Sequence, residues 1–279
     1  MGYKDYGIEI PNGKISGEVD CICPKCSADR KKTNLKPLRV NLDKGAWLCH
    51  HCGWTGGLPK EGGYVPAEPK TYKKPVWSNK LDLSDGLVKW FEKERKISQN
   101  TLKTLKVTEA SVWMPQIGGE RNCIQFNYFR NTELINIKSR DGAKNFKLES
   151  GAELIFYNLD SVIGAKEVYI VEGEIDILTL HESGIIRETV GAVSVPNGAN
   201  LNKNNLQYID NCIDLFDAVE KIHIATDNDI AGRKLREELA ERFGKERCDF
   251  IEFGTCKDLN ELLVAKGIDG VISHCGEKI

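Results

Sequence analysis

The chain has 279 residues, of which 41% are apolar and 29% charged, and its formal net charge at pH 7 is −2. This composition is typical of a globular protein with room for one good-sized domain and a small one. Because no apolar run approaches the ~20 residues that span a bilayer, we exclude a helical membrane protein and expect a cytoplasmic one.

The near-neutral charge hides an asymmetry along the chain. Residues 1–80 carry 14 Lys and Arg against 8 Asp and Glu, whereas residues 166–279 carry 13 against 22. A basic front and an acidic rear fit a protein that grips a phosphate backbone with one end and holds metal with the other. Solubility alone is the alternative explanation of such an asymmetry.

Two CxxC pairs stand near the N-terminus, with 22 residues between them. Disulfides are rare in a reducing compartment, whereas two residues between thiolates let both reach one tetrahedral ion. We therefore predict a small β zinc ribbon over residues 1–57, holding one structural Zn²⁺ through Cys23, Cys26, Cys49 and Cys52. The alternatives are Cys21 in place of Cys23, and His50 or His51 in place of a thiolate.

Cations and aromatic rings are interleaved between and beside the two pairs. Such a mixture suits single-stranded nucleic acid, because cations meet phosphates and rings stack on bases. A ribbon that binds protein is the alternative. The residues concerned are Arg30, Lys31, Lys32, Lys36, Arg39, Trp47, His50 and Trp54.

The next segments predict a linker and then an α+β subdomain. Residues 58–78 are rich in Gly, Pro and Lys without an apolar period, which favours a flexible tether that lets the ribbon move. Residues 79–160 begin with helical spacing, in which we interpret Trp90 and Phe91 as core. Two strands are then expected at 123–129 and 133–138, around a polar turn.

A second cluster of cations lies in residues 138–147. A turn at Asp141-Gly142 would bring the Lys and Arg side chains of its two flanks together. A solvated hairpin face is the ordinary interpretation of such a charge run.

Acidic clusters follow two predicted buried strands. Residues 166–171 run into Glu172, and residues 221–225 lead to Asp227. Carboxylates at the carboxyl ends of parallel strands meet in one crevice, where a divalent cation would relieve their repulsion. Oxygen ligands suit Mg²⁺ or Mn²⁺. Helix N-capping is the alternative for single acids such as Asp229. The predicted ligands are Glu172, Glu174, Asp176, Asp227, Asp229 and Asp258.

These motifs resemble a known family. Glu172-Gly173-Glu174 with the Asp-x-Asp-x-x-Gly of residues 227–232 resembles the Toprim domain of topoisomerases and bacterial-type primases. VEGEIDILTL from Val171, SVPNGA from Ser194, ATDNDIAGRK from Ala225 and CKDLNELL from Cys256 are similar to the primase half of bifunctional T-odd phage primase-helicases.

The resemblance implies an α/β fold for residues 161–279. This would be a Toprim domain, a Rossmann-like and mostly parallel sheet with helices on both faces. The basic α+β subdomain of residues 79–160 would precede it, completing an RNA polymerase domain.

The implied activity is that of a DNA primase. Ribonucleoside triphosphates would pair with single-stranded DNA, and a 3′-hydroxyl would attack an α-phosphate with loss of pyrophosphate. Asp227 and Asp229 would bind the catalytic metal, and Glu172 would share it or act as general base. Glu174, Asp176 and Asp258 would complete the shell.

Two further roles follow from the resemblance alone. Lys138, Arg140 and Lys144 would contact the phosphates of incoming nucleotides. The zinc ribbon would read a short template sequence through Arg30, Lys31, Lys36, Trp47 and His50.

Other functions remain open at this stage. A Toprim nuclease would use the same metal cradle, and a non-catalytic helicase accessory would use the fold alone. No GxxxxGK[ST] motif occurs, so a replicative helicase would be a separate chain or a missing C-terminal half. Motor ATP hydrolysis and unaided hexamer formation are therefore not expected, and the implied setting is the cytoplasm of a phage-infected bacterium.

Overall fold

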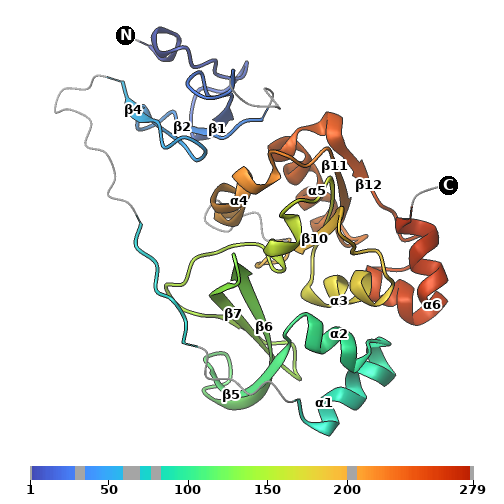
Figure 1. Cartoon of the computed structure of the whole chain (residues 1–279). Helices are drawn as coiled ribbons and strands as arrows, with labels where there is room; N and C mark the ends of the chain where they lie inside the picture. Colours follow the sequence, from blue (N-terminus) through green and yellow to red (C-terminus); the bar gives the residue numbers. More distant parts are fainter. Residues whose placement is uncertain (1, 29–34, 59–69, 77–82, 200–205, 277–279) are drawn as a thin grey trace.

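The computed structural model describes residues 2–28, 35–58, 70–76, 83–199 and 206–276. Three four-stranded sheets follow one another along the chain, and Figure 1 shows the first of them, in blue, set apart from the other two. No helix in these ranges has both the length and the apolarity that a membrane crossing requires.

The N-terminal ribbon is an antiparallel sheet with a small core of its own. A short helical turn precedes strands in the order β1-β2-β3-β4, and the ribbon core contains Ile8, Leu38 and Trp47. A Cβ atom on Gly56 would lie 2.4 Å from the Trp47 ring, so only glycine lets β4 cross this side chain. The strands are β1 (Glu18–Cys21), β2 (Leu38–Asn41), β3 (Ala46–Cys49) and β4 (Thr55–Gly57).

Short helices open the middle part of the chain. Helix α1 (Asp85–Trp90) begins where the Ser84 hydroxyl accepts the Leu87 N–H, and it runs directly into a π-helical turn, Phe91–Arg95. Helix α2 (Gln99–Thr104) has Ser98 as its N-cap. The Phe91 side chain is fully buried and Trp90 packs partly exposed against the same core, as their spacing predicts.

An antiparallel sheet follows in the order β5-β6-β7-β8. The predicted strand pair is present as β6 and β7, and a third hairpin brings Phe146 opposite Arg140. The Asp141-Gly142 turn therefore joins the two flanks of the basic segment. The strands are β5 (Thr108–Met114), β6 (Gly119–Arg130), β7 (Glu133–Asp141) and β8 (Phe146–Leu148).

The C-terminal part is a parallel sheet in the order β10-β9-β11-β12. Its strands are β9 (Glu167–Val171), β10 (Val190–Ser194), β11 (Lys221–Ala225) and β12 (Cys248–Phe250). Its helices are α3 (Glu174–Glu182), α4 (Gln207–Cys212), α5 (Ile230–Phe243) and α6 (Leu259–Cys275). Short 3₁₀ turns at Leu159–Val162, Ile213–Phe216 and Lys245–Arg247 complete it.

The strand order determines where a ligand crevice lies. The chain leaves β9 toward β10 on one side and leaves β11 toward β12 on the other. Because such crossovers are right-handed, α3 and α5 cover opposite faces, and a crevice opens between the carboxyl ends of β9 and β11. The predicted α/β class, with a parallel sheet behind an α+β part, is confirmed.

One hydrophobic core joins the middle and C-terminal parts. It runs from Phe91 through Tyr128 and Tyr157 to the strands of the parallel sheet, whereas the ribbon core is separate. The predicted boundaries at residues 57, 78 and 160 stay predictions.

The described part of the predicted linker lies against the body. The Lys73 N–H donates to the Gly151 carbonyl at 2.8 Å, and Gln207 of α4 donates to the Tyr72 hydroxyl at 2.7 Å. Residues 59–69, 77 and 78 lie outside the described residues.

Candidate active site and zinc ribbon

A cavity of about 630 Å³ opens at the carboxyl ends of β9 and β11. Carboxylates of the parallel sheet face cations of the middle part across it. The acidic lining residues are Glu172, Glu174, Asp176, Asp227 and Asp258; the basic ones are Arg95, Lys138, Arg140, Lys144, Lys147 and Lys257. Five of the six predicted acids therefore share one cavity, and Asp229 lies beside it, its carboxylate 3.5 Å from the ammonium of Lys257.

Glu172 follows β9 and is held by two backbone donors. Its Oε1 accepts the Ala199 N–H at 3.1 Å, from the loop that contains Gly198, and its Oε2 accepts the Asp227 N–H at 3.4 Å. Burial and then the Asp227 charge raise the pKa of Glu172 to about 7. The carboxyl end of β9 is thus tied to that of β11.

The two aspartates after β11 have different surroundings. Burial raises the pKa of Asp227, although Lys257 opposes this. Asp229 is the N-cap of α5: its Oδ1 accepts the Gly232 N–H at 2.8 Å, and this bond lowers its pKa. A Cβ on Gly232 would lie 2.1 Å from the Asp227 carbonyl, so glycine lets α5 start this close to the strand. Capping and cation binding by Asp229 are compatible.

The remaining three acids have structural partners. Glu174 accepts hydrogen bonds from the Tyr128 hydroxyl at 2.5 Å and from Lys138 Nζ at 2.7 Å. Asp176 accepts the N–H groups of Gly173 and Asn260, and burial, followed by the Asp258 charge, raises its pKa well above the usual range. Asp258 caps α6. Lys138 already neutralises the charge of Glu174, so Glu172, Asp227 and Asp229 are the leading ligand candidates, and the six-acid shell stays a prediction.

The chemistry of these three carboxylates fits a hard divalent cation. Glu172 and Asp227 are buried carboxylates with raised pKa values, so a bound cation would relieve their mutual repulsion, and the more exposed Asp229 offers a further oxygen ligand. Among the described residues, only four cysteines bring three or more ligand atoms within 4.8 Å of one another. The carboxylate oxygens of the acids do not form such a group of three. The ammonium of Lys257 lies 3.2 Å from Asp227 and 3.5 Å from Asp229.

The predicted nucleotide-binding cations differ in their surroundings. Lys138 is buried and pairs with Glu174 in the lining of the cavity, and its contact with nucleotide phosphates stays a prediction. Arg140 is 7% exposed, and no hydrogen bond or ion pair to its guanidinium is found within the described part of the chain. Its guanidinium lies 5.4 Å from the centre of the Trp90 ring, a cation–π contact. Lys144 is exposed at the hairpin turn and lines the cavity.

Outside the predicted basic segment of residues 138–147, sequence reasoning missed two basic residues of the cavity. Arg95 lies 5.0 Å from the Trp90 ring and donates to the Asn260 side chain at 3.2 Å. It belongs to the charge run of residues 92–96, which is indistinguishable in sequence from a solvated helix face. Lys257 directly precedes a predicted acid, and that adjacency was the available signal.

The four predicted zinc ligands come together in the ribbon. The Sγ atoms of Cys23 and Cys52 are 3.8 Å apart, as are those of Cys26 and Cys49. Burial raises the pKa of Cys49 to about 12, so a bound cation is needed to hold this thiol as a thiolate. A closed set of four sulfurs is the chemistry of a structural Zn²⁺ site.

The alternatives to this set are not supported. Cys21 lies on β1 outside the four-sulfur group. His50 and His51 turn away from it, toward Asp210 and Asp217 of the body.

Comparisons with known proteins identify the family of the chain. A family model described as Toprim-like matches residues 169–263. The primase homolog protein of Arabidopsis thaliana is 32% identical over 287 residues, which cover 95% of this chain and 82% of that protein. The chain belongs to this primase family.

Two further similarities define the limits of that assignment. The Twinkle homolog protein, chloroplastic/mitochondrial, of the same plant is 31% identical over 94% of this chain, but the chain spans only 39% of that relative's length. The primase fragment of the bacteriophage T7 primase-helicase has a TM-score of 0.55 at 24% identity, covering 86% of this chain and 93% of that one, which shows the shared fold. A Toprim primase family is confirmed; the bifunctional phage type stays a prediction.

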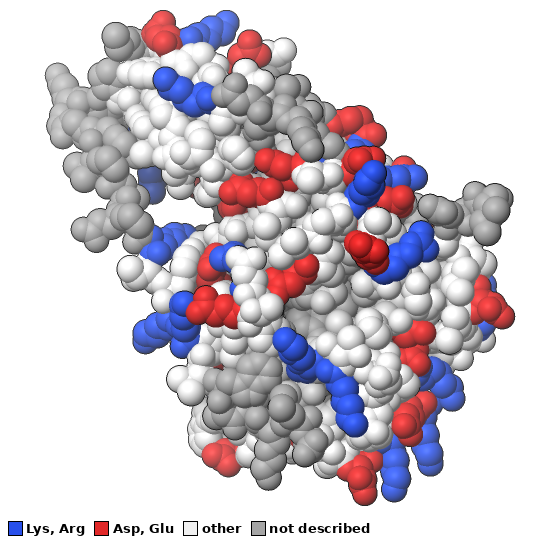
Figure 2. Space-filling view, viewed as in Figure 1, with Lys and Arg blue, Asp and Glu red and all other residues white. Residues whose placement is uncertain are grey.

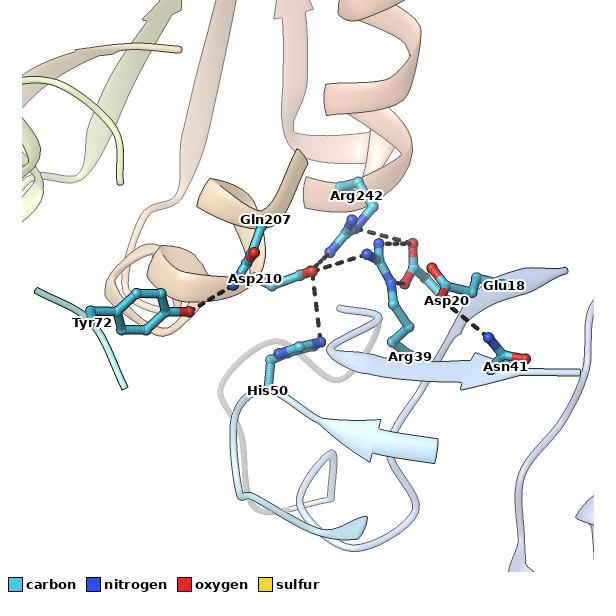
Figure 3. Close-up of polar contacts among 9 residues, drawn as sticks. All are labelled: Glu18, Asp20, Arg39, Asn41, His50, Tyr72, Gln207, Asp210 and Arg242. Carbon is cyan, nitrogen blue, oxygen red and sulfur yellow. Dashed lines mark hydrogen bonds and ion pairs between the residues drawn. The ribbon is translucent and has the colours of Figure 1, made fainter. Parts of the chain in front are cut away.

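In this member of the primase family the ribbon is docked on the body. Figure 3 shows Arg39 and His50 of the ribbon and Arg242 of α5 pointing at Asp210 of α4. Arg39 donates to Asp210 at 3.0 Å, and Arg242 pairs with both Asp210 and Asp20. The movable ribbon expected from the linker is thus held by buried ion pairs.

The structure limits the access of a template to two of the predicted template-binding residues. Trp47 is 3% exposed and packs against Tyr6 and Trp54, so it has no free face for a base. His50 lies in the docking interface, where burial lowers its pKa. Lys36 is exposed, whereas Arg30, Lys31 and Lys32 lie outside the described residues.

The charge asymmetry of the sequence does not produce separate basic and acidic faces in this view. Figure 2 shows basic and acidic side chains interspersed over both ribbon and body. In the described ribbon, Arg39 is neutralised by Asp20 and Asp210. Net charge alone therefore does not locate a nucleic-acid surface.

The raised pKa of Glu172 predicts how divalent-ion affinity depends on pH. Because its carboxyl must lose a proton to bind a cation, Mn²⁺ affinity should rise about tenfold per pH unit up to about pH 7 and level off above it. Electron paramagnetic resonance of free Mn²⁺ measures this on the zinc-loaded protein. The slope should disappear in Glu172→Gln, and a flat profile in the unsubstituted protein would refute the assignment.

Proposed function

We propose that the chain is a DNA primase that makes short RNA primers on single-stranded DNA by metal-dependent nucleotidyl transfer. The observation that carries this proposal is the cavity in which carboxylates after β9 and β11 face the cations of the middle part, in a chain of a primase family. Polymerisation requires both sides of this cavity: the acidic side at the reacting phosphate and the basic side at the triphosphate.

The acidic side and the basic side of the cavity each have a role in this reaction. Glu172, Asp227 and Asp229 would hold the divalent ion, and that ion, when bound, would neutralise charge developing on the attacked phosphate. Arg140 has a buried guanidinium for which the described residues supply no acceptor, which suits a phosphate oxygen. Arg95 and Lys144 stand beside the same space. The Lys138–Glu174 ion pair lies in the lining of the same cavity.

The raised pKa of Glu172 also suits it to accept a proton near neutral pH. In the proposed reaction it either binds the metal or takes the proton of the attacking 3′-hydroxyl. The zinc ribbon would select the template, and a helicase would be the partner in replication. The phage-type assignment belongs to this proposal as well.

Primer synthesis tests the proposal directly. The protein is incubated with single-stranded DNA, labelled ribonucleoside triphosphates and Mg²⁺ or Mn²⁺. Short labelled oligoribonucleotides should form, and Asp227→Asn or Asp229→Asn should lower the yield by about 100-fold or more, since each removes a ligand charge. Asparagine keeps the size of both side chains, and at position 229 it can still cap α5, so folding is preserved.

Controls separate the proposal from its rivals. Asp269→Asn, an exposed acid on α6, should leave synthesis unchanged. Metal-dependent shortening of the DNA with no labelled product would instead indicate the nuclease. Absence of both reactions in folded, zinc-loaded protein would indicate a non-catalytic accessory.

A further inference from the structure

One ammonium lies between the two carboxylates that the proposed reaction needs for its metal. Lys257 Nζ is 3.2 Å from an Asp227 oxygen and 3.5 Å from an Asp229 oxygen. These two acids form the Asp-x-Asp segment after β11. The lysine comes from the loop before α6, so two distant segments of the chain meet here.

The backbone of Lys257 is fixed to the acidic segment. The Asn228 N–H donates to the Lys257 carbonyl at 2.8 Å, and the Asn228 side chain donates to the Cys256 carbonyl at 2.9 Å. Asn228 stands between the two aspartates in sequence. The position of the lysine main chain relative to both carboxylates is therefore set by hydrogen bonds rather than by the charges.

The Lys257 side chain, in contrast, can move away from the two carboxylates. The Lys257 side chain is 57% exposed, and it lines the cavity. An exposed ion pair is weak, because water screens it and because a long side chain loses entropy in holding one geometry. A stronger cation can therefore displace this ammonium without disturbing the fold.

Charge explains why a cation is present at this point. Glu172, Asp227 and Asp229 converge on the crevice, and the ammonium opposes the rise in the pKa of Asp227 that burial causes. One positive charge offsets part of this repulsion. A divalent ion would offset more of it and would require the same oxygen atoms.

We propose that Lys257 is the built-in counter-ion of this site, which holds Asp227 and Asp229 until a divalent ion displaces it, and thereby lowers the affinity of the site for that ion. This proposal rests on the divalent-ion site of the proposed function. It assigns to Lys257 a positioning role toward the two aspartates.

Mn²⁺ binding to the zinc-loaded protein, without DNA or nucleotides, tests this exchange. Lys257→Met keeps the length of the side chain and removes its charge. We expect Mn²⁺ to bind this variant about three- to tenfold more tightly, since the ion no longer competes with an ammonium for the same oxygens. The melting temperature without Mn²⁺ should fall and should be restored by the ion.

Two variants serve as controls. Lys257→Arg should bind Mn²⁺ within about twofold of the unsubstituted protein, because the charge is retained. Lys266→Met removes an exposed lysine of α6 and should leave the affinity unchanged.

The outcomes are distinguishable. If Asp227→Asn weakens Mn²⁺ binding but Lys257→Met binds with unchanged or lower affinity, the exchange is refuted and the metal site stands. If the unsubstituted protein binds no Mn²⁺ that depends on Asp227, the exchange and the proposed function both fail.

Discussion

Lys138→Met should destabilise the body by about 3–5 kcal/mol, because it removes one partner of a buried ion pair. The side chains of Lys138 and Glu174 are 10% and 4% exposed, and their charged atoms are 2.7 Å apart. The substitution leaves Glu174 with the Tyr128 hydroxyl as its partner. Urea denaturation followed by far-UV circular dichroism measures the loss.

A double variant separates this structural role from nucleotide binding. Lys138→Met combined with Glu174→Gln removes both charges and should recover most of the lost stability. If Lys138→Met instead unfolds at the same urea concentration as the unsubstituted protein but makes no primers, then Lys138 acts on the nucleotide and the structural assignment is wrong. Arg140→Met is the useful comparison, since Arg140 has no recorded carboxylate partner among the described residues.

Asp210→Ala should release the zinc ribbon from the body. The Asp210 carboxylate is the common ion-pair partner of Arg39, His50 and Arg242, and the Asp210 side chain is 4% exposed. Without it, Arg242 is left buried with Asp20 alone, at a cost of about 3–5 kcal/mol to the docked state. Small-angle X-ray scattering should show a larger radius of gyration, because the ribbon moves away on its linker.

A nearby acid provides the control for this experiment. Glu18 pairs with Asn41 inside the ribbon, as Figure 3 shows, so Glu18→Ala should leave the scattering unchanged. An unaltered radius in Asp210→Ala would mean that apolar contacts, not the ion pairs, hold the ribbon. Release would also expose His50, which makes template-dependent initiation in this variant a direct test of its predicted role.

The features that the sequence predicted correctly are those that depend on residues close to one another in the chain. Two residues between thiols dictate that both reach one ion, and the four predicted cysteines do come together. A β-branched strand such as residues 167–171 followed by Glu172 implies a strand end, and parallel strands bring such ends into one crevice. The helical spacing of apolar residues likewise predicted Trp90 and Phe91 as core residues, and both pack in or against the core.

The roles of charged residues were predicted less well. In sequence, Lys138 and Arg140 look like equivalent members of one basic run. The structure pairs the first with Glu174, from a helix 36 positions away, and leaves the second against Trp90. Trp47 looked suited to base stacking, but the ribbon needs it as core.

Spacing within a few residues predicted the two CxxC pairs, the parallel strands and the acids at their ends, whereas the fold excluded Cys21, His50 and His51 as zinc ligands. The charges that are already neutralised could be found only in the folded chain: Glu174 by Lys138, Asp210 by two arginines, and Asp227 by Lys257. An electrostatic partner is defined by distance and burial, not by position in the sequence. Residues remote along the chain reach such proximity only when the sheets and helices have packed.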